Sequence, residues 1–124
     1  MSGGSGSFYA ADLTVTTQLT GCSIIYDLSG DRSNMVAAHV RPTGTTGPLL
    51  CQALRAGAAL SNAIGGGAGG VFGAVGAREQ NGYVMAEGAC YFIGVRVGGA
   101  WELHGQQYAV GAPLAAPRTW QIVP

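Results

Sequence analysis

Residues 12–18 alternate β-branched or apolar side chains with polar ones, the two-residue period of a half-buried β-strand, and two further strand-like runs follow before residue 41. This pattern predicts strands over residues 12–18, 22–28 and 35–40. Turn-forming residues separate these strands, at positions 20–21 and 29–34. Because both connections are short, we expect the three strands to pair as an antiparallel meander.

The middle of the chain changes to the spacing of a helix. Pro48 suits the first turn of a helix, and apolar residues recur at helical spacing over residues 49–64 until the glycine cluster at 65–70 ends the pattern. Short strands separated by glycine are predicted beyond it, over residues 71–75, 82–85, 90–97, 101–110 and 120–123. This order of elements predicts an α+β fold: a compact, β-sandwich-like mixed sheet, mostly antiparallel, with one main helix packed on it.

Length and composition indicate one folded domain. The chain has 124 residues, a common size for a single core, and 48% of them are apolar while only 10% are charged. Disordered chains have the opposite balance. Residues 2–7 are all glycine or serine, and we expect residues 1–11 to be a flexible leader or a scar left at an engineered junction. Residues 12–124 are expected to form the domain.

The distribution of charge argues against two kinds of partner. The formal net charge is zero, the basic residues are single arginines, and lysine is absent. A nucleic acid or an anionic membrane surface would require a clustered basic patch, so neither is expected as a partner. No apolar run approaches the length of a transmembrane helix, and the first residues lack the basic and apolar regions of a secretory signal.

The cysteine spacing and the glycine cluster argue against bound cofactors. Cys22, Cys51 and Cys90 are an odd number at wide spacing, which matches neither a disulfide framework nor a zinc site. The glycine cluster at 65–70 contains no lysine and follows a helix, whereas a phosphate-binding loop precedes one. We therefore expect reduced thiols in a cytosolic setting, and a flexible loop rather than a phosphate-binding one at 65–70.

The hairpin between the second and third strands places a cysteine near a histidine. If Gly30 and Asp31 are the central residues of a two-residue type II′ turn, Cys22 lies directly opposite His39. Opposed side chains in such a pair have Cβ atoms roughly 4.5–5.5 Å apart. A longer loop within 29–34 would change the strand register, and Cys22 and His39 would no longer lie directly opposite each other.

A thiol beside an imidazole is the arrangement of a cysteine-dependent hydrolase. Cys22 would attack an amide carbon, and His39 would serve as the base and then protonate the leaving amine. Gly21 lets a substrate approach the backbone closely, so the Cys22 N–H is a candidate donor to the oxyanion. Thr16 is the candidate for orienting the imidazole, because a short return of strand 12–18 would bring it beside Cys22.

The remaining cysteines and the second histidine have simpler interpretations. Cys51 and Cys90 lie in apolar runs and are expected to be buried packing residues. His104 is an alternative base, although nothing in its sequence surroundings ties it to a thiol.

The residues around the predicted nucleophile resemble a known group of enzymes. Residues 19–23, Leu-Thr-Gly-Cys-Ser, are followed by a strand, a turn and Ala-Ala-His at 37–39. This arrangement resembles the bacterial toxin glutamine deamidases, a superfamily that includes the cytotoxic necrotizing factor catalytic domain and the Burkholderia lethal factor, with the chemotaxis-receptor deamidase CheD as a more distant relative. In that group a Leu-Ser-Gly-Cys motif carries the nucleophile, and Thr20 stands here in place of the serine. Thr16 matches by position a threonine that assists in some members.

The resemblance implies a specific activity and setting. It implies that residues 12–124 form a single catalytic domain, a protein-glutamine glutaminase with Cys22, His39 and Thr16 as catalytic residues. The substrate would be a glutamine side-chain amide in a target-cell protein, with transglutamination as a side activity and without metal or cofactor. It also implies a virulence toxin or effector, secreted or injected by a bacterium without a secretory signal peptide, that acts in the target-cell cytosol. We expect it to be a monomer.

Two alternatives are open at this point. The same Cys22–His39 pair would serve a cysteine peptidase or amidase that cleaves a peptide bond, because both reactions use a thiolate, a base and an oxyanion donor. The low charge and high glycine content also suit a β-rich binding domain without catalytic activity.

Overall fold

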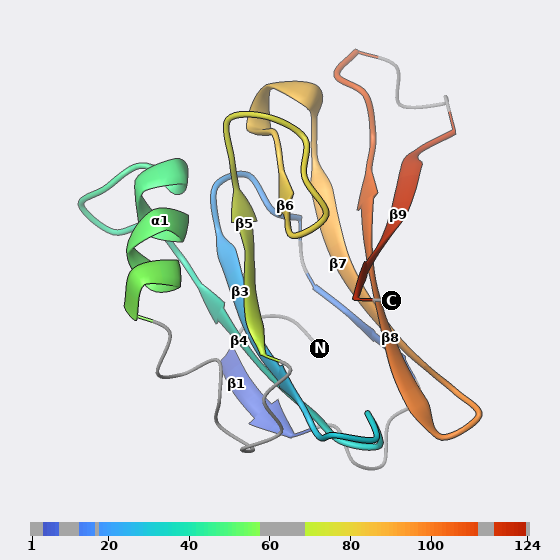
Figure 1. Cartoon of the computed structure of the whole chain (residues 1–124). Helices are drawn as coiled ribbons and strands as arrows, with labels where there is room; N and C mark the ends of the chain where they lie inside the picture. The colour runs from blue at the N-terminus through green and yellow to red at the C-terminus, as the bar shows by residue number, and fades with distance from the viewer. Residues whose placement is uncertain (1–3, 8–12, 17, 58–68, 112–115, 124) are drawn as a thin grey trace.

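The described part of the chain folds into two facing β-sheets with a helix outside the first (Figure 1). The computed structural model describes residues 4–7, 13–16, 18–57, 69–111 and 116–123. Within these residues the arrangement confirms the predicted α+β class, with mostly antiparallel sheets and one main helix packed on them.

The first sheet has the strand order β1-β4-β3-β5-β6. Its strands are β1 (Gly4–Ser7), β3 (Ser23–Leu28), β4 (Met35–Val40), β5 (Gly70–Ala74) and β6 (Gly82–Tyr83). All of its pairs are antiparallel except β5 with β6, which run parallel. Residues 4–7 fall within the predicted leader, and here they pair with β4 as an edge strand.

The second sheet has the strand order β2-β7-β8-β9 and is antiparallel throughout. Its strands are β2 (Leu13–Val15), β7 (Cys90–Val97), β8 (Ala100–Gln107) and β9 (Arg118–Val123). The predicted three-stranded meander is therefore wrong. Strands β3 and β4 form an antiparallel pair, but β2 pairs with β7 in the other sheet. A side chain at Gly94 would collide with the Thr14 methyl group, so the glycine makes room for the inward residue of β2.

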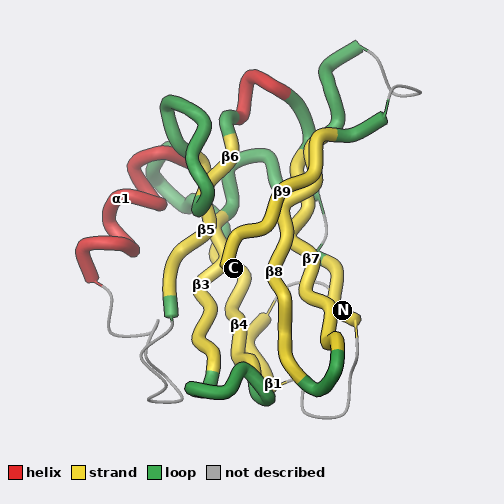
Figure 2. Tube along the Cα trace, turned by 45° about the vertical axis from the view of Figure 1, so that its right-hand side comes forward, coloured by secondary structure: helices red, strands yellow, loops and turns green. Residues whose placement is uncertain are grey.

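Two helical segments complete the described structure. They are α1 (Gly47–Gly57) and the short 3₁₀ helix η2 (Met85–Glu87). Helix α1 covers the outer face of the first sheet, where Cys51 packs with Ile25 and Val71 (Figure 2). The predicted continuation over residues 58–64 lies outside the described residues. No helix in the described ranges is long and apolar enough to cross a membrane.

An aromatic core fills the space between the two sheets. It is built around the fully buried rings of Phe72, Tyr83, Phe92 and Trp101, with Tyr26 beside them. Phe72 lies 5.8 Å from Phe92 between ring centroids, which joins the sheets directly. Burying each such ring contributes roughly 1.5–3 kcal/mol relative to exposure. Residues on the inner face of either sheet therefore lie against this core.

Candidate functional site

The β3–β4 hairpin has a different register from the predicted one. His39 pairs with Ile24, so the prediction that it lies directly opposite Cys22 is wrong. The strands are joined by a four-residue loop, closed by the Ser29 N–H donating to the Asn34 carbonyl at 3.0 Å. The two-residue turn assumed from the sequence does not form.

A carboxylate inside this loop explains its length. The Asp31 carboxylate accepts hydrogen bonds from the Ser33 hydroxyl (2.7 Å), the Ser33 N–H (3.0 Å) and the Ser29 hydroxyl (2.9 Å). These bonds lower the pKa of Asp31 to about 2. Arg32 adopts φ 60°, and its N–H donates to the Ser29 carbonyl at 2.8 Å. Side-chain hydrogen bonds to nearby backbone favour this wider loop over a type II′ turn.

Cys22 and His39 nevertheless lie on the same face of the first sheet. The register differs from the predicted one by two residues, and a shift of two keeps every side chain on its side. Cys22 packs against the inter-sheet core, as do Met35 and Ala37 on β4, and alternation places His39 on their side. Cys22 is therefore a diagonal neighbour of His39. Such neighbours are roughly 7–8 Å apart, and neither ring nitrogen of His39 makes a hydrogen bond with the Cys22 thiol.

The imidazole of His39 is shielded but has no hydrogen-bond partner in the part of the chain that the structure describes. Both Nδ1 and Nε2 are inaccessible to solvent, although the residue as a whole is half-buried. Burial, and secondarily the positive charge of Arg41, lowers the pKa of His39. The ring is therefore favoured in its neutral form, the form that accepts a proton. Shielded polar atoms without a protein partner are uncommon in folded proteins.

The three thiols differ in their surroundings. Cys22 is half-buried, whereas Cys51 and Cys90 are 1% and 0% exposed, as predicted for packing residues. Burial raises the pKa of Cys51, and it raises the pKa of Cys90 to about 12. A buried thiol kept protonated is a poor nucleophile. Cys22 is thus the most exposed of the three thiols.

The backbone before Cys22 is shaped by a glycine. Gly21 has φ 141°, in the region that side-chain-bearing residues rarely adopt. The space next to its Cα is bordered at 3.6–3.8 Å by Pro42, Met85 and Gly47. The start of α1 and the η2 turn therefore meet at the Gly21–Cys22 segment.

A buried tyrosine holds this segment from beneath. The Tyr83 hydroxyl accepts a hydrogen bond from the Gly21 N–H at 2.8 Å and donates one to the Cys22 carbonyl at 2.6 Å. Because the Gly21 N–H is engaged, the Cys22 N–H is the candidate oxyanion donor of this segment. Sequence analysis did not identify Tyr83, since the contact joins residues more than sixty positions apart and β6 has no distinctive local pattern.

Thr16 lies in the second sheet and not beside Cys22. Its N–H donates to the Phe92 carbonyl at 3.0 Å, and its hydroxyl accepts a hydrogen bond from the Phe92 N–H at 2.9 Å. The predicted return of strand 12–18 next to Cys22 is therefore wrong. Among the described residues, Thr16 makes no hydrogen bond with His39.

The alternative base, His104, lies away from any thiol on the outer face of β8. Its neighbours Leu103 and Gly105 point inward and are buried, so alternation directs His104 outward. Its Nε2 lies 3.4 Å from the Glu102 carboxylate. This pairing gives the ring a structural partner, and it does not support a catalytic role.

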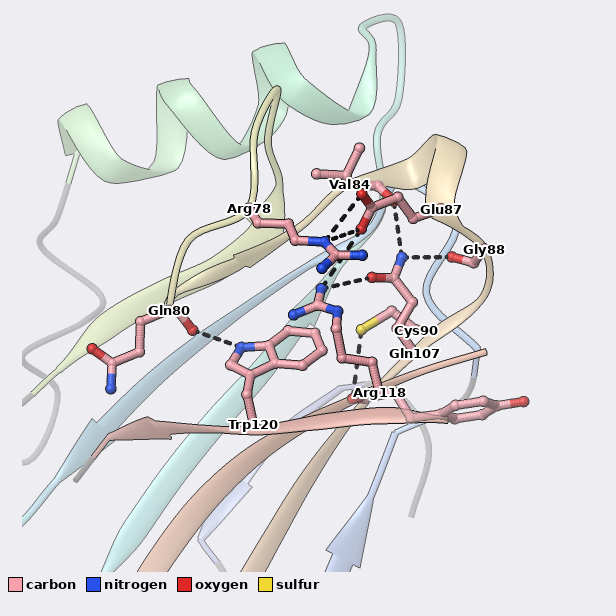
Figure 3. A network of polar contacts seen from close by, with 10 residues as sticks. Arg78, Gln80, Val84, Glu87, Gly88, Cys90, Gln107, Arg118 and Trp120 are labelled. Atoms are coloured by element: carbon pink, nitrogen blue, oxygen red, sulfur yellow. Dashed lines mark hydrogen bonds and ion pairs between the residues drawn. The ribbon is translucent and has the colours of Figure 1, made fainter. Parts of the chain in front are cut away.

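A second polar cluster lies beside η2 and β9 (Figure 3). The Glu87 carboxylate accepts two hydrogen bonds from Arg78 Nε, at 2.8 and 3.1 Å. The Arg118 guanidinium lies 3.8 Å from the same carboxylate and stacks 4.0 Å above the Trp120 ring. These groups line part of a pocket of about 130 Å³ that contains no nucleophile.

Gln107 fixes the floor of that cluster. It is 3% exposed, and its amide nitrogen donates to the Val84 and Gly88 carbonyls at 2.8 and 2.9 Å. Its amide oxygen accepts a hydrogen bond from Arg118 at 3.1 Å. Every polar atom of this buried side chain is thus used inside the protein.

Comparison with known proteins identifies no relative. No family model, no curated protein and no solved structure matches this chain. Over the residues that the structure describes, no group of three or more histidine, cysteine or acidic side chains is arranged to hold a metal ion. No relative therefore supplies a function for this chain.

Proposed function

We propose that this chain is a cysteine-dependent protein glutamine deamidase, a bacterial toxin or effector enzyme of the kind its Cys22 segment resembles. One observation carries the proposal. Cys22, the half-buried thiol, shares an inner sheet face with His39, whose shielded ring nitrogens have no partner among the described residues. An imidazole held in neutral form near a thiol is equipped to take its proton.

The reaction divides into two steps. In the first, His39 accepts the thiol proton while Cys22 Sγ attacks the carboxamide carbon of a glutamine side chain. The C–N bond breaks, His39 returns the proton to the departing ammonia, and a thioester remains on Cys22. In the second, His39 deprotonates a water molecule that attacks the thioester, and glutamate and the free thiol are released. A primary amine in place of water would give transglutamination.

The backbone before Cys22 supplies the electrostatic part of the mechanism. The tetrahedral intermediate carries a negative oxygen, which requires N–H donors aimed at it. The N–H of Cys22, which directly follows Gly21, is the donor that we assign to this role. Thr16 as the group that orients His39 stays a prediction: its oxygen accepts a hydrogen bond from the Phe92 N–H, and among the described residues it makes none with His39.

The half-buried position of Cys22 favours a side-chain amide over a peptide bond. A glutamine carboxamide stands at the end of two methylene groups and reaches a recessed thiol without bringing the substrate main chain equally close. Cleavage of a peptide bond requires that the main chain itself enters the site. A cysteine peptidase is therefore the second candidate function. The reaction product distinguishes it from a deamidase, because a peptidase creates new peptide termini.

The deciding experiment identifies the product. The protein is incubated with a eukaryotic cell lysate, and mass spectrometry records glutamine-to-glutamate conversion and new peptide termini. We expect conversion at defined glutamines with the wild-type protein and with Cys51→Ala, and none with Cys22→Ser. New termini in place of conversion would replace deamidation with proteolysis. Equal product with wild type and Cys22→Ser would overturn the proposal.

A further inference from the structure

Tyr83 connects the core of the protein to the Gly21–Cys22 segment. It is fully buried on β6, and its ring packs against Phe72 with centroids 5.7 Å apart. Burial also raises its pKa, so the hydroxyl keeps its proton throughout the physiological range. The side chain is thus a fixed donor and acceptor rooted in the aromatic core.

The hydroxyl of Tyr83 holds both ends of one dipeptide. It accepts from the Gly21 N–H at 2.8 Å and donates to the Cys22 carbonyl at 2.6 Å. The peptide unit between these two atoms carries the Cys22 N–H. With both flanking groups fixed, the direction of that N–H and of the Cys22 Cα–Cβ bond is set by the tyrosine.

The segment needs such an anchor. Gly21 has φ 141°, and glycine has more conformational freedom than any other residue, so the backbone there is not self-restrained. Reacting groups in an enzyme have to be held close to their productive geometry, and a displacement of about 1 Å can cost on the order of a hundredfold in rate.

We propose that Tyr83 is the positioning residue of Cys22: its hydroxyl fixes the Gly21–Cys22 backbone and thereby the directions of the Cys22 Cα–Cβ bond and of the Cys22 N–H. This inference rests on the proposed thiol chemistry. It adds a residue from the opposite half of the chain that neither the sequence pattern nor the resemblance identifies.

The test measures Cys22 alkylation by iodoacetamide as a function of pH in folded protein. Tyr83→Phe removes only the hydroxyl and keeps the packed ring. Tyr26→Phe is the matched control, because Tyr26 is also buried and loses a single hydrogen bond of 2.8 Å to Asn81, away from the Gly21 segment. We expect Tyr83→Phe to slow Cys22 alkylation at pH 7 about tenfold or more, and Tyr26→Phe to leave it unchanged.

The pH profile distinguishes positioning from general loosening of the fold. In Tyr83→Phe the rate should rise only at alkaline pH, as in the urea-unfolded chain, while the Tyr26→Phe profile should follow the wild type. Equal rates and profiles for the three proteins would overturn the positioning role. Equal slowing in both variants would also overturn it, because any buried hydroxyl would then have the same effect.

A measurement on the wild-type protein covers the case in which Tyr83→Phe does not fold. Amide hydrogen exchange at Gly21 should be as slow as in β3, because the N–H is buried against the Tyr83 hydroxyl. Exchange at the rate of an unprotected amide would overturn the inference. Failure of the proposed function has a different signature: wild-type Cys22 would then be alkylated at pH 7 no faster than in the unfolded chain.

Discussion

The Cys22 region and the Glu87 cluster lie at the two ends of the same short helix, η2, and they differ in whether their polar side chains have hydrogen-bond partners. Met85 at its start borders Gly21, and Glu87 at its end pairs with Arg78. Around Glu87 each charged or amide group meets a protein partner. On the Cys22 side, His39 has two shielded nitrogens that meet none within the described residues.

This difference separates a structural network from a reactive one. The paired groups around Glu87 tie η2, β8 and β9 together. A shielded base without a partner lowers stability, and such groups persist where they have a function. The contrast agrees with the proposal that Cys22 and His39, rather than the charged residues around Glu87, carry the chemistry.

The largest effect on activity is expected when Cys22 or His39 is replaced. Cys22→Ser and His39→Ala should each reduce glutamine conversion by about a thousandfold or more, and the double variant should lose no more than either single one. The two residues act as one unit, so their effects do not add. Conversion is measured by mass spectrometry, with circular dichroism as the control for folding. Substantial turnover in either single variant would refute the assignment.

The next largest effect should fall on stability in the satisfied cluster. Gln107→Leu removes the amide donor to the Gly88 carbonyl and to the Val84 carbonyl, which keeps its bond from the Glu87 N–H, and should cost about 1–3 kcal/mol of unfolding free energy. Gln106→Leu, on the same strand but contacting only the Tyr108 hydroxyl, is the control and should cost less. Urea unfolding measures both. Iodoacetamide alkylation of Cys22 should be unaffected in either variant, and a change would show that the two regions are coupled.

A substitution of Thr16 tests whether this residue belongs to the reactive region. Thr16→Ala leaves the Phe92 N–H without its side-chain acceptor and should cost about 0.5–1.5 kcal/mol. Turnover should fall, but by much less than in Cys22→Ser, because a carbonyl or water can replace an orienting hydroxyl in part. Thr16→Ser should match the wild type in both measurements. Full turnover in Thr16→Ala would remove the residue from the mechanism and leave a Cys22–His39 pair.

The smallest expected effect is a pH dependence that belongs to His39. Its pKa is lowered in the fold below the ordinary value of about 6.5, so the unfolded chain binds more protons in this range. The resulting stability is present above pH 6.5 and is lost as the pH falls toward the folded pKa. The urea midpoint of the wild type should therefore drop from pH 7.5 to 5 by more than that of His39→Gln. Identical drops would contradict the shielding of the ring.

Local patterns predicted the elements well. Alternation located β4 at residues 35–40 and β7 at residues 90–97 with the observed bounds. Helix α1 begins one residue before the predicted Pro48 start. Residues 82–85 were predicted as one strand but divide into β6 and the start of η2.

Contacts between distant segments were beyond those patterns. The pairing of β2 with β7 depends on room at Gly94, and the hairpin register depends on the side-chain bonds of Asp31 inside its loop. The sequence correctly identified which face Cys22 and His39 share, because the register error was an even number of residues. It could not identify Tyr83, whose role exists only once β6 lies beneath Gly21.

The most direct test of the account is competitive alkylation of the three cysteines by iodoacetamide near neutral pH, in wild type and in His39→Ala. Mass spectrometry of the labelled peptides gives a rate for each thiol. We predict that wild-type Cys22 reacts faster than Cys51 and Cys90 and faster than Cys22 in the urea-unfolded chain, and that His39→Ala abolishes the second difference. A Cys22 rate equal to that of the unfolded chain, or unchanged by His39→Ala, would contradict the claim that His39 activates Cys22.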